Sequence, residues 1–563
     1  MRPTQSNEKL ISSLLETINP KLIADDSVRQ MVELLLNLIE ELNSKVIELE
    51  AENQRLKDEI NRLKKEQGKP DIKAKKPRGF DKKNYSSEKE RKSPKKHSKG
   101  RKIENIKIDR EQIAKYPQDQ LPADAVFKGY EEVIVQDIKL CTDNILFHKE
   151  KYYSPSEKKT YLAELPPGYE GEFGPGLKAF VISLYYGGNM TQSKLLEWLT
   201  DIDISISAGH LSNLLIKKHQ GFEREKEEIC AAGLASSPWQ HLDQTSGRVA
   251  GVNQTINILG NPFYTIYVTT AKKDRLSVLQ ALENGRELEF LLNPVTYELL
   301  SKFEVPPKWQ KALRQLPQKV FGQSEFKSLL EAHLPGLGPR LRKHILEAAA
   351  IAYYQQSSEW PVVRTLVCDD APQFKSLTED LSLCWVHEAR HYKKLNPLVA
   401  YHRKLLEQFR DNFWDYYRKL LAYKEAPSDA RASSLRAEFE RLFGTETGYQ
   451  QLDERKRLTS AKIAELLLVL DHPELPLHNN PAELAARTMV QRRRISYGTQ
   501  TAEGTKAWDT FLSLVSTTRK LGISFFEYVR DRLKETGTIP SLATIIRERS
   551  AHNPFGWSWQ PES

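Results

Sequence analysis

A leucine recurs at every seventh position between residues 35 and 63, and this heptad repeat is typical of a helix in a coiled coil. Heptad position d is filled by Leu35, Leu42, Leu49, Leu56 and Leu63. Position a is filled by Val32, Ile39, Val46, Asn53 and Ile60. β-Branched residues at a with leucine at d favour two parallel helices, and one asparagine at a fixes their register. We therefore predict a parallel leucine-zipper coiled coil over residues 28–66, after an N-terminal segment at 1–27.

The charged residues beside this seam also fit a pair of chains. Contacts between position g of one helix and position e of its partner join opposite charges: Lys45 with Glu50, Glu52 with Lys57, and Glu59 with Lys64. An antiparallel hairpin within one chain is the alternative, but it explains neither the lone asparagine nor these pairs. A homodimer, or a higher oligomer, formed through this zipper is therefore expected.

The positive charge of the chain is concentrated in one short segment. Residues 64–102 contain 17 Lys or Arg against five Asp or Glu, a local charge of +12, so the rest of the chain carries −3 of the total +9. A segment rich in Lys, Pro and Ser and poor in apolar residues is expected to be disordered when free. We interpret residues 67–120 as a basic flexible tether, either a solubilising spacer or a non-specific grip on phosphates.

Some protein classes are excluded by what the sequence lacks. The first residues are not followed by the apolar run of a signal peptide, and no stretch approaches the ~18 uncharged apolar residues of a membrane span. Four cysteines, at positions 141, 230, 368 and 384, are too few and too scattered for a disulfide framework. We expect a cytoplasmic protein with no membrane partner.

Two small modules are predicted after the tether. Alternating apolar residues such as Val133, Val135 and Ile138 predict a small β module over residues 121–175. Short helical patterns at 177–186, 191–199 and 208–218 predict a helix-turn-helix-like region over 176–235. Its last helix would enter the major groove of DNA, and the candidate DNA contacts are Ser212, Asn213, Lys217 and Lys218. The alternative is an ordinary helical support for the next domain.

Three carboxylates carry the strongest chemical signal. Asp243 and Asp369 each end an apolar, strand-like run, and Glu483 opens a helix-like run. Carboxylates on rigid elements can hold two divalent ions for phosphoryl transfer, and Mg²⁺ prefers oxygen ligands. Strand, strand, helix is the order in which a ribonuclease-H-like fold gathers them. We predict such an α/β core at 236–535, with helical insertions near 276–360 and 388–470, and a tail at 536–563.

Each carboxylate also has a structural explanation of its own. Asp243 could cap a turn, and one of the neighbours Asp369 and Asp370 could simply be solvated. Asn480 as N-cap, with Pro481 at the first helical position and Glu483 at the third, would make a capping box. The catalytic interpretation therefore depends on all three carboxylates together.

Two further groups of residues accompany the carboxylates. Cys384, His387 and His391 could bind metal, but structural zinc sites use four ligands, so we favour packing and hydrogen bonding. Four arginines follow Glu483 on the same predicted helix: Arg487, Arg492, Arg493 and Arg494. They form either a solvated face or a contact to DNA phosphates.

These motifs together resemble the insertion-sequence-66 family of DDE transposases, over about residues 121–533. The resemblance is carried by four stretches: Asp243-Gln244-Thr245, Asp369-Asp370-Ala371-Pro372-Gln373-Phe374, Cys384-Trp385-Val386-His387-Glu388-Ala389-Arg390, and Asn479-Asn480-Pro481-Ala482-Glu483 with Arg487. By position, Asp369 rather than Asp370 matches the second aspartate of the family. Two departures are a lone Cys141 where relatives often carry a Cys-x-x-Cys zinc module, and Leu484 in place of an arginine.

The resemblance implies a function as well as a fold. It implies that Asp243, Asp369 and Glu483 are catalytic and bind two Mg²⁺ (or Mn²⁺) ions. It implies cleavage and strand transfer at the terminal inverted repeats of an insertion element. The expected partners are double-stranded DNA of ends and target, with possible accessory proteins encoded by the element, at a prokaryotic nucleoid. The alternatives are an inactive or domesticated transposase that only binds DNA, and a structure-specific nuclease of the same fold.

Overall fold

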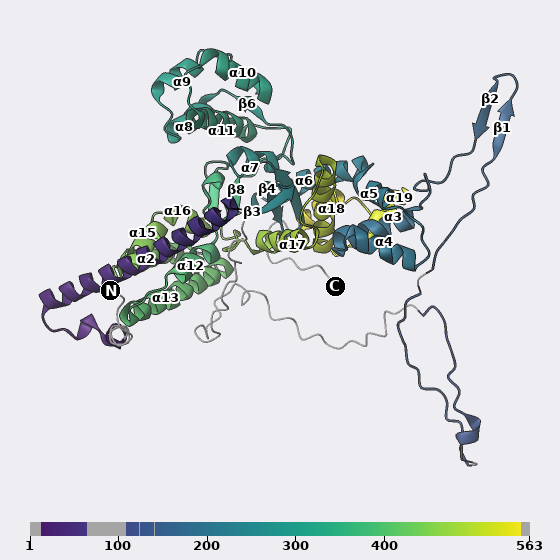
Figure 1. Cartoon of the computed structure of the whole chain (residues 1–563), viewed down its shortest axis with the longest axis horizontal. Coiled ribbons are helices and arrows are strands. Elements are labelled where there is room, and N and C mark those ends of the chain that lie inside the picture. The colour runs from purple at the N-terminus through teal and green to yellow at the C-terminus, as the bar shows by residue number, and fades with distance from the viewer. Residues whose placement is uncertain (1–12, 65–107, 123, 140, 553–563) are drawn as a thin grey trace.

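The computed structural model describes residues 13–64, 108–122, 124–139 and 141–552 (Figure 1). Most of the predicted basic tether therefore lies outside the described residues. No described helix combines the length and apolar character that crossing a membrane requires.

A five-stranded mixed sheet lies at the centre, in the order β5-β4-β3-β8-β9. Its strands are β3 (Trp239–Val249), β4 (Val252–Asn261), β5 (Tyr264–Thr270), β8 (Thr365–Cys368) and β9 (Asp380–Leu383). The first three form an antiparallel meander, and β8 and β9 add in parallel to β3. Ala250 and Gly251, both with positive φ, make the tight β3–β4 turn. This arrangement is compatible with the predicted ribonuclease-H-like core.

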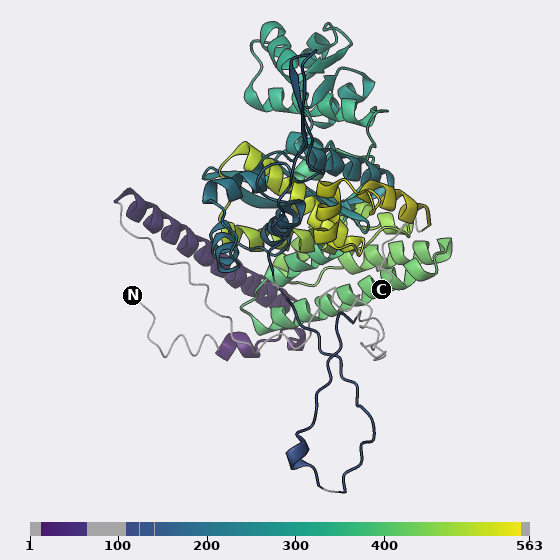
Figure 2. The same ribbon diagram turned by 90° about the vertical axis from the view of Figure 1, so that its right-hand side faces the viewer.

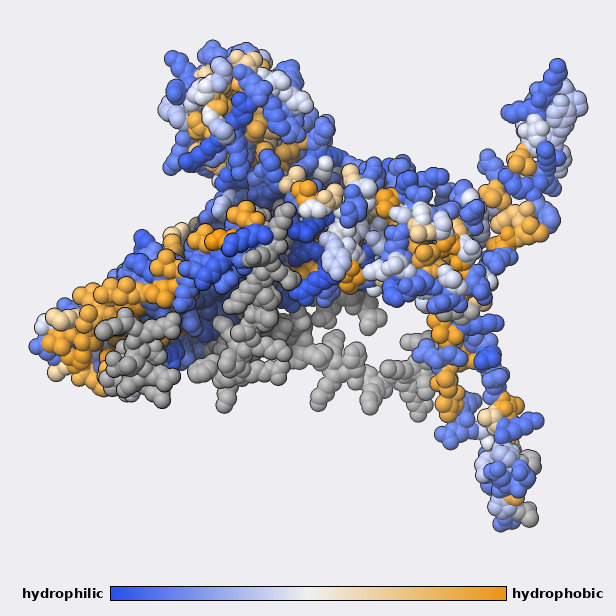
Figure 3. All heavy atoms as spheres, in the orientation of Figure 1, coloured by the Kyte–Doolittle hydropathy of each residue, from blue (hydrophilic) through white to orange (hydrophobic). Residues whose placement is uncertain are grey.

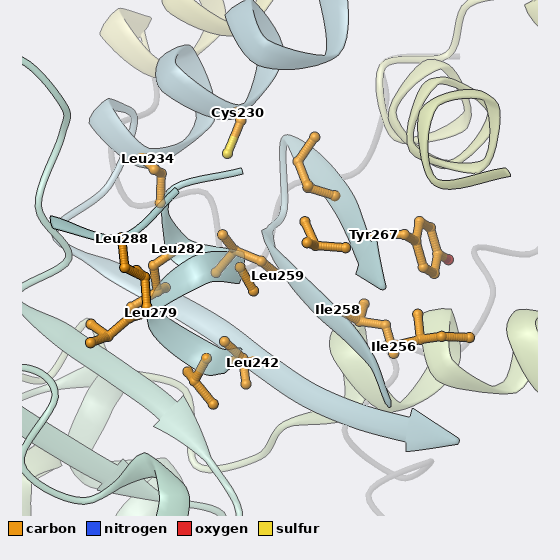
Figure 4. Close-up of a cluster of buried hydrophobic side chains, with 14 of the residues drawn as sticks. Cys230, Leu234, Leu242, Ile256, Ile258, Leu259, Tyr267, Leu279, Leu282 and Leu288 are labelled. Atoms are coloured by element: carbon orange, nitrogen blue, oxygen red, sulfur yellow. The ribbon is translucent and has the colours of Figure 1, made fainter. Parts of the chain in front are cut away.

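Helices cover the sheet and bury its apolar residues. They are α6 (Gln220–Ala235), α17 (Asn480–Ser496) and α18 (Ala502–Lys520). Figure 4 shows buried side chains on both faces of the sheet, with Ile258 and Tyr267 on one side and Leu259 on the other, in a cluster that also contains Cys230 of α6. Burial of such side chains is the main favourable contribution to folding.

The outer edge of β5 is closed by α18 rather than by another strand. The backbone N–H groups of Thr265, Tyr267 and Thr269 donate to side chains of α18 at 3.2, 2.9 and 2.7 Å. The acceptors lie at every fourth residue of the helix: Thr517, Ser513 and Asp509. Four helical residues rise about 6 Å and two strand residues about 7 Å, so the spacings match. An edge strand satisfied in this way cannot pair with another chain.

Two helical insertions interrupt the core. The first insertion comprises α7 (Arg275–Leu282), β6 (Glu289–Leu291), α8 (Pro294–Lys302), α9 (Pro307–Leu313), β7 (Val320–Gly322), α10 (Gln323–His333) and α11 (Pro339–Gln355). The second comprises α12 (Trp385–Lys394), α13 (Ala400–Glu425), α14 (Asp429–Gly444), α15 (Gln450–Ser460), α16 (Ile463–Leu466) and η6 (Leu468–Leu470). The second has its own aromatic core, in which Phe413, Tyr416 and Phe439 pack around Trp385.

The described part of the tail predicted at 536–563 contains a helix. After α19 (Phe525–Lys534), residues Leu542–His552 form α20. Leu542, Ala543 and Ile546 are buried in the main hydrophobic core, and α20 packs against α6. This short apolar stripe, which Pro- and Trp-containing residues follow in the sequence, was not recognised as a helix. Residues 553–563 of the predicted tail lie outside the described residues.

Residues Asp26–Leu63 form one continuous helix, α2, which packs against the second insertion. The packed face includes two residues of the predicted zipper seam, Val32 and Ile39 at position a. Leu36 and Glu40 are 2% exposed, and Glu40 accepts the N–H groups of Leu398 and Val399 at 3.0 and 2.8 Å. The five position-d leucines remain at least half exposed, and Figure 3 shows hydrophobic side chains gathered along this helix. Pairing of two such helices stays a prediction.

The small β module predicted at 121–175 is reduced to a hairpin. Its strands are β1 (Lys151–Ser154) and β2 (Lys159–Leu162), and the described residues between 124 and 150 contain no strand. Val133, Val135 and Ile138 are 74–80% exposed. Alternation produces a stable strand only where one face can be buried, and no second layer covers this segment.

Residues 175–216 are helical, close to the predicted pattern. They form α3 (Pro175–Ile182), the π-helical turn η4 (Ser183–Gly187), α4 (Gln192–Asp201) and α5 (Ala208–Ile216). Thr191 and Ser207 cap the last two helices by accepting the N–H groups of Lys194 and His210. A role for these helices in reading DNA stays a prediction.

Candidate active site

The register between β3 and β8 brings two predicted aspartates to one place. The parallel pairing aligns His241 with Val367. Asp243 lies two residues beyond His241, and Asp369 lies two residues beyond Val367. Side chains two residues apart in a strand point to the same face. The two carboxylates therefore emerge side by side where β8 ends.

Asn479 brings the third carboxylate to the same place. Its side-chain NH₂ donates to the carbonyl of Leu242 at 2.8 Å, and its Oδ1 lies 2.9 Å from His241 Nδ1. Its backbone N–H donates to Cys384 Sγ at 3.2 Å. These bonds hold the start of α17 against β3, and Glu483 stands in the first turn of that helix.

The capping box predicted at this helix start is absent. The N-cap is Asn479 rather than Asn480, and its side chain makes no capping bond within the helix. Glu483 instead donates its backbone N–H to the Asn479 carbonyl at 3.1 Å. The Glu483 carboxylate is thus free to face the aspartates rather than being used to cap the helix.

The three carboxylates are close enough to interact electrostatically. Burial, together with the negative charges of Asp369 and Glu483, raises the pKa of Asp243 to about 6. The N–H of Gln244, which donates to Asp243 Oδ1 at 2.7 Å, opposes this shift. Like charges gathered in a partly buried site disfavour each other, so a bound cation would stabilise the cluster.

Arg390 of α12 lies directly on Glu483. Its NH2 group donates to Glu483 Oε2 at 2.6 Å, and its NH1 lies 2.8 Å from His387 Nε2. His387 Nδ1 is 3.6 Å from Glu483 Oε1, which is buried and accepts no hydrogen bond. Arg390 was not among the site residues predicted from the sequence, although it lies three residues after His387 and such residues share one helix face.

The cysteine and histidines have separate environments. Cys384, His387 and Glu483 have potential ligand atoms within 4.8 Å of one another, whereas His391 is not part of this group. Burial raises the pKa of Cys384 to about 12, which disfavours the thiolate form that binds metal. Because its sulfur accepts the Asn479 N–H, Cys384 contributes to holding α17.

Asp370 points away from the cluster formed by its neighbour Asp369. Its carboxylate is 2.9 Å from Lys375 Nζ and 3.1 Å from Lys462 Nζ. These two lysines lower the pKa of Asp370 despite its partial burial. Asp370 is therefore engaged by lysines, and Asp369 is the aspartate that acts on Asp243.

One of the arginines predicted to contact DNA, Arg492, is not accessible for such a contact. Its side chain is fully buried, with the guanidinium 4.1 Å from the Tyr185 ring and hydrogen-bonded to the Tyr185 carbonyl. Arg493 donates to Ser246 Oγ at 2.7 Å, while Arg487 and Arg494 are exposed. Consecutive helical residues are about 100° apart, so a run of three arginines cannot share one face.

The predicted contacts on α5 are accessible. Asn213, Lys217 and Lys218 are exposed and Ser212 is half-buried. Lys218 has a positive φ of 62°, at the break that follows the helix. Contact of these residues with DNA stays a prediction.

Comparison with known proteins gives two matches. Residues 350–507 match the family model described as "Transposase IS66 family". That range includes Asp369, Arg390 and Glu483. A relative described as "Uncharacterized protein y4jO", from Sinorhizobium fredii (strain NBRC 101917 / NGR234), is 33% identical over 329 residues. The alignment covers 57% of this chain and 99% of the relative.

Proposed function

Because the chain belongs to the IS66 family of transposases, we propose that it binds the terminal inverted repeats of its insertion element and cleaves and joins DNA strands there. The observation that carries the proposal is the gathering of Asp243, Asp369 and Glu483 from three distant segments. Their electrostatic interaction appears in the raised pKa of Asp243. Carboxylates on two strands and one helix suit phosphoryl transfer.

The cluster fits divalent cations. Its donors are all carboxylate oxygens, which Mg²⁺ prefers, and Glu483 Oε1 is buried without a hydrogen-bond partner. We propose that Asp243, Asp369 and Glu483 hold two Mg²⁺ or Mn²⁺ ions. When bound, such ions activate the attacking oxygen and stabilise the leaving oxygen of the phosphodiester.

The surrounding residues would orient the reacting groups. The strands fix the two aspartates, and Asn479 fixes the helix that carries Glu483. Arg390, whose side chain is 44% exposed, can exchange its bond to Glu483 for a bond to a DNA phosphate. A guanidinium binds phosphate oxygens through fixed, paired donors.

The assembly that we propose is a dimer through the seam of α2. Its leucines are exposed along the helix, and a shallow groove lined by Val46, Leu49 and Asn53 runs along the seam. A second copy of α2 would bury these side chains. Because Glu40 fixes α2 to the second insertion, the pairing would also set the distance between two catalytic domains.

The proposed function is tested by incubating the full chain with a labelled duplex that carries one end of the element. With Mg²⁺ present, we expect strand breaks at the repeat and joined products with a second duplex. Binding without any break would favour the domesticated DNA-binding alternative. Breaks at branched junctions without joining would favour the nuclease alternative.

A further inference from the structure

Helices α8 to α11 of the first insertion, with β6 and β7, stand clear of the central sheet in both ribbon views (Figures 1 and 2), whereas α7 packs against β4 and β5. Two stretches of this insertion, 305–324 and 332–346, contain seven Lys or Arg and no Asp or Glu. These cations are Lys308, Lys311, Arg314, Lys319, Arg340, Arg342 and Lys343. Such one-sided charge attracts polyanions.

Packing brings the two stretches together at one edge of this insertion. A Cβ on Gly336, in the turn between α10 and α11, would lie 3.6 Å from the ring of Trp309 on α9. Lys308 Nζ lies 5.0 Å from the centroid of the same ring. Leu334 and Leu337 are buried and anchor the turn. We call Lys308, Lys311 and Arg340, with the turn at 335–338, the basic edge.

The cations of the basic edge are not neutralised within the described residues. Elsewhere in the two stretches, Lys319, Arg342 and Lys343 lie 2.6, 2.6 and 3.6 Å from carboxylates. By contrast, Lys308, Lys311 and Arg340 are exposed, and the described part of the chain offers no carboxylate within ion-pair distance of them. Three unpaired cations on one edge leave an uncompensated positive charge.

The shape of the turn suits a close approach by another molecule. Gly336 and Gly338 are exposed, and glycine permits backbone to approach closely. Gly338 is the N-cap of α11 and has no side chain to accept the first N–H groups of that helix. The helix start therefore adds donors beside Arg340, although the three cations provide most of the attraction.

Resting on the proposed function, we propose that the basic edge binds the phosphate backbone of double-stranded DNA, away from the bond that is cut. Contacts of this kind position a duplex but do not read its sequence. The edge would thus hold DNA of any sequence against the catalytic domain, while end recognition is made elsewhere.

The test measures binding of the full chain to a random-sequence duplex by fluorescence anisotropy, at salt concentrations between about 50 and 200 mM. Replacing Lys308, Lys311 and Arg340 together by Glu should lower the slope of log affinity against log salt by about two to three. The matched control replaces Lys302, Lys319 and Lys327 of the same insertion by Glu. An edge variant that behaves like the control would overturn the proposal.

A second variant tests the same edge without risk to the fold. A Cβ at Gly338 meets no atom within 4 Å, and Asp is a preferred N-cap residue. Gly338→Asp should therefore keep the melting temperature while weakening duplex binding several-fold, because its carboxylate repels phosphate. Gly338→Asn supplies the same cap without charge and should bind like wild type. If the triple variant does not fold, equal binding by the Asp and Asn variants overturns the proposal.

The two proposals fail in different ways. A wild-type chain that binds no duplex at all would contradict the proposed function. A wild-type chain that cleaves element ends, while the edge variants bind random duplex like their controls, would contradict only the role of the basic edge.

Discussion

Arg390 and Glu483 form an ion pair of 2.6 Å across the start of α17. The pair joins the helix that follows β9 to the carboxylate that arrives last in the sequence. Glu483 is 12% exposed and Arg390 44% exposed, so the cation lies on the solvent side. A phosphate that approaches Glu483 from this side meets the guanidinium before the carboxylate.

Arg390→Gln should therefore reduce strand cleavage by about 10²-fold, a typical loss for one preorganised donor. DNA binding should change little, because many other cations contribute to it. Arg390→Lys keeps the charge but loses the paired donors and should recover only part of the rate. Rates are compared on the same end-carrying duplex. If Arg390→Gln cleaves at the wild-type rate, Arg390 has only a structural role, as the ion-pair partner of Glu483.

Replacing Asp243, Asp369 or Glu483 by Ala should each abolish cleavage while leaving end binding nearly intact, since each removes a proposed metal ligand. Asp370→Asn is the matched control because it changes the adjacent carboxylate, which is held by lysines. It should keep most of the activity. If Asp370→Asn abolishes cleavage and Asp369→Asn does not, then Asp370 rather than Asp369 is the metal ligand.

The carboxylates were predictable because local signals mark them. Apolar runs end at Asp243 and Asp369, and the register of β3 with β8 then follows from the fold. The family prediction is confirmed by the matching family model. The carboxylate roles remain proposals, since only geometry and electrostatics support them.

Other features depend on contacts that local sequence does not encode. Asn479 forms hydrogen bonds with His241 and Leu242, more than 230 residues away in the sequence. From the sequence alone, the residues that follow it fit the pattern of a capping box. Arg492 is buried only because Tyr185 and Trp508 enclose it. The alternation at 121–150 predicts strands, yet no layer is present to bury them.

Asp243 should give the metal-free chain a distinctive pH dependence. Its pKa is raised from 3.8 to about 6, so ionising it in the folded state costs on the order of 2–3 kcal/mol. That cost is absent below about pH 4 and complete above about pH 6. Asp243→Asn should therefore gain stability over wild type as pH rises through this window. Melting curves in chelator at about pH 4.5 and 7 measure the gain, and a pH-independent difference contradicts the raised pKa.

Lys462 should stabilise the packing of the second insertion against the core. It lies 2.6 Å from Glu388, whose side chain is 3% exposed, and 3.1 Å from Asp370. Lys462→Met leaves buried negative charge less compensated and should cost about 3 kcal/mol in urea unfolding. Adding Glu388→Gln should recover part of that loss. If the double variant loses more free energy of unfolding than the two single variants lose together, the charges of Lys462 and Glu388 do not compensate each other.

The seam of α2 should determine the oligomeric state. Leu49 and Leu56 are 68% and 55% exposed in the single chain, so replacing both by Glu should not disturb the fold. In a dimer the same carboxylates would be buried against each other, and we expect sedimentation of the full chain to change from dimer to monomer.

Asn53→Leu should act in the opposite direction, raising zipper stability but loosening the preference for two strands. The matched control for the Glu replacements is Leu34→Glu, which changes a leucine that is 70% exposed but lies outside positions a and d. A wild-type chain that sediments as a monomer at tens of micromolar would rule out the zipper as the dimer contact, and α2 would then serve only to brace the second insertion through Glu40.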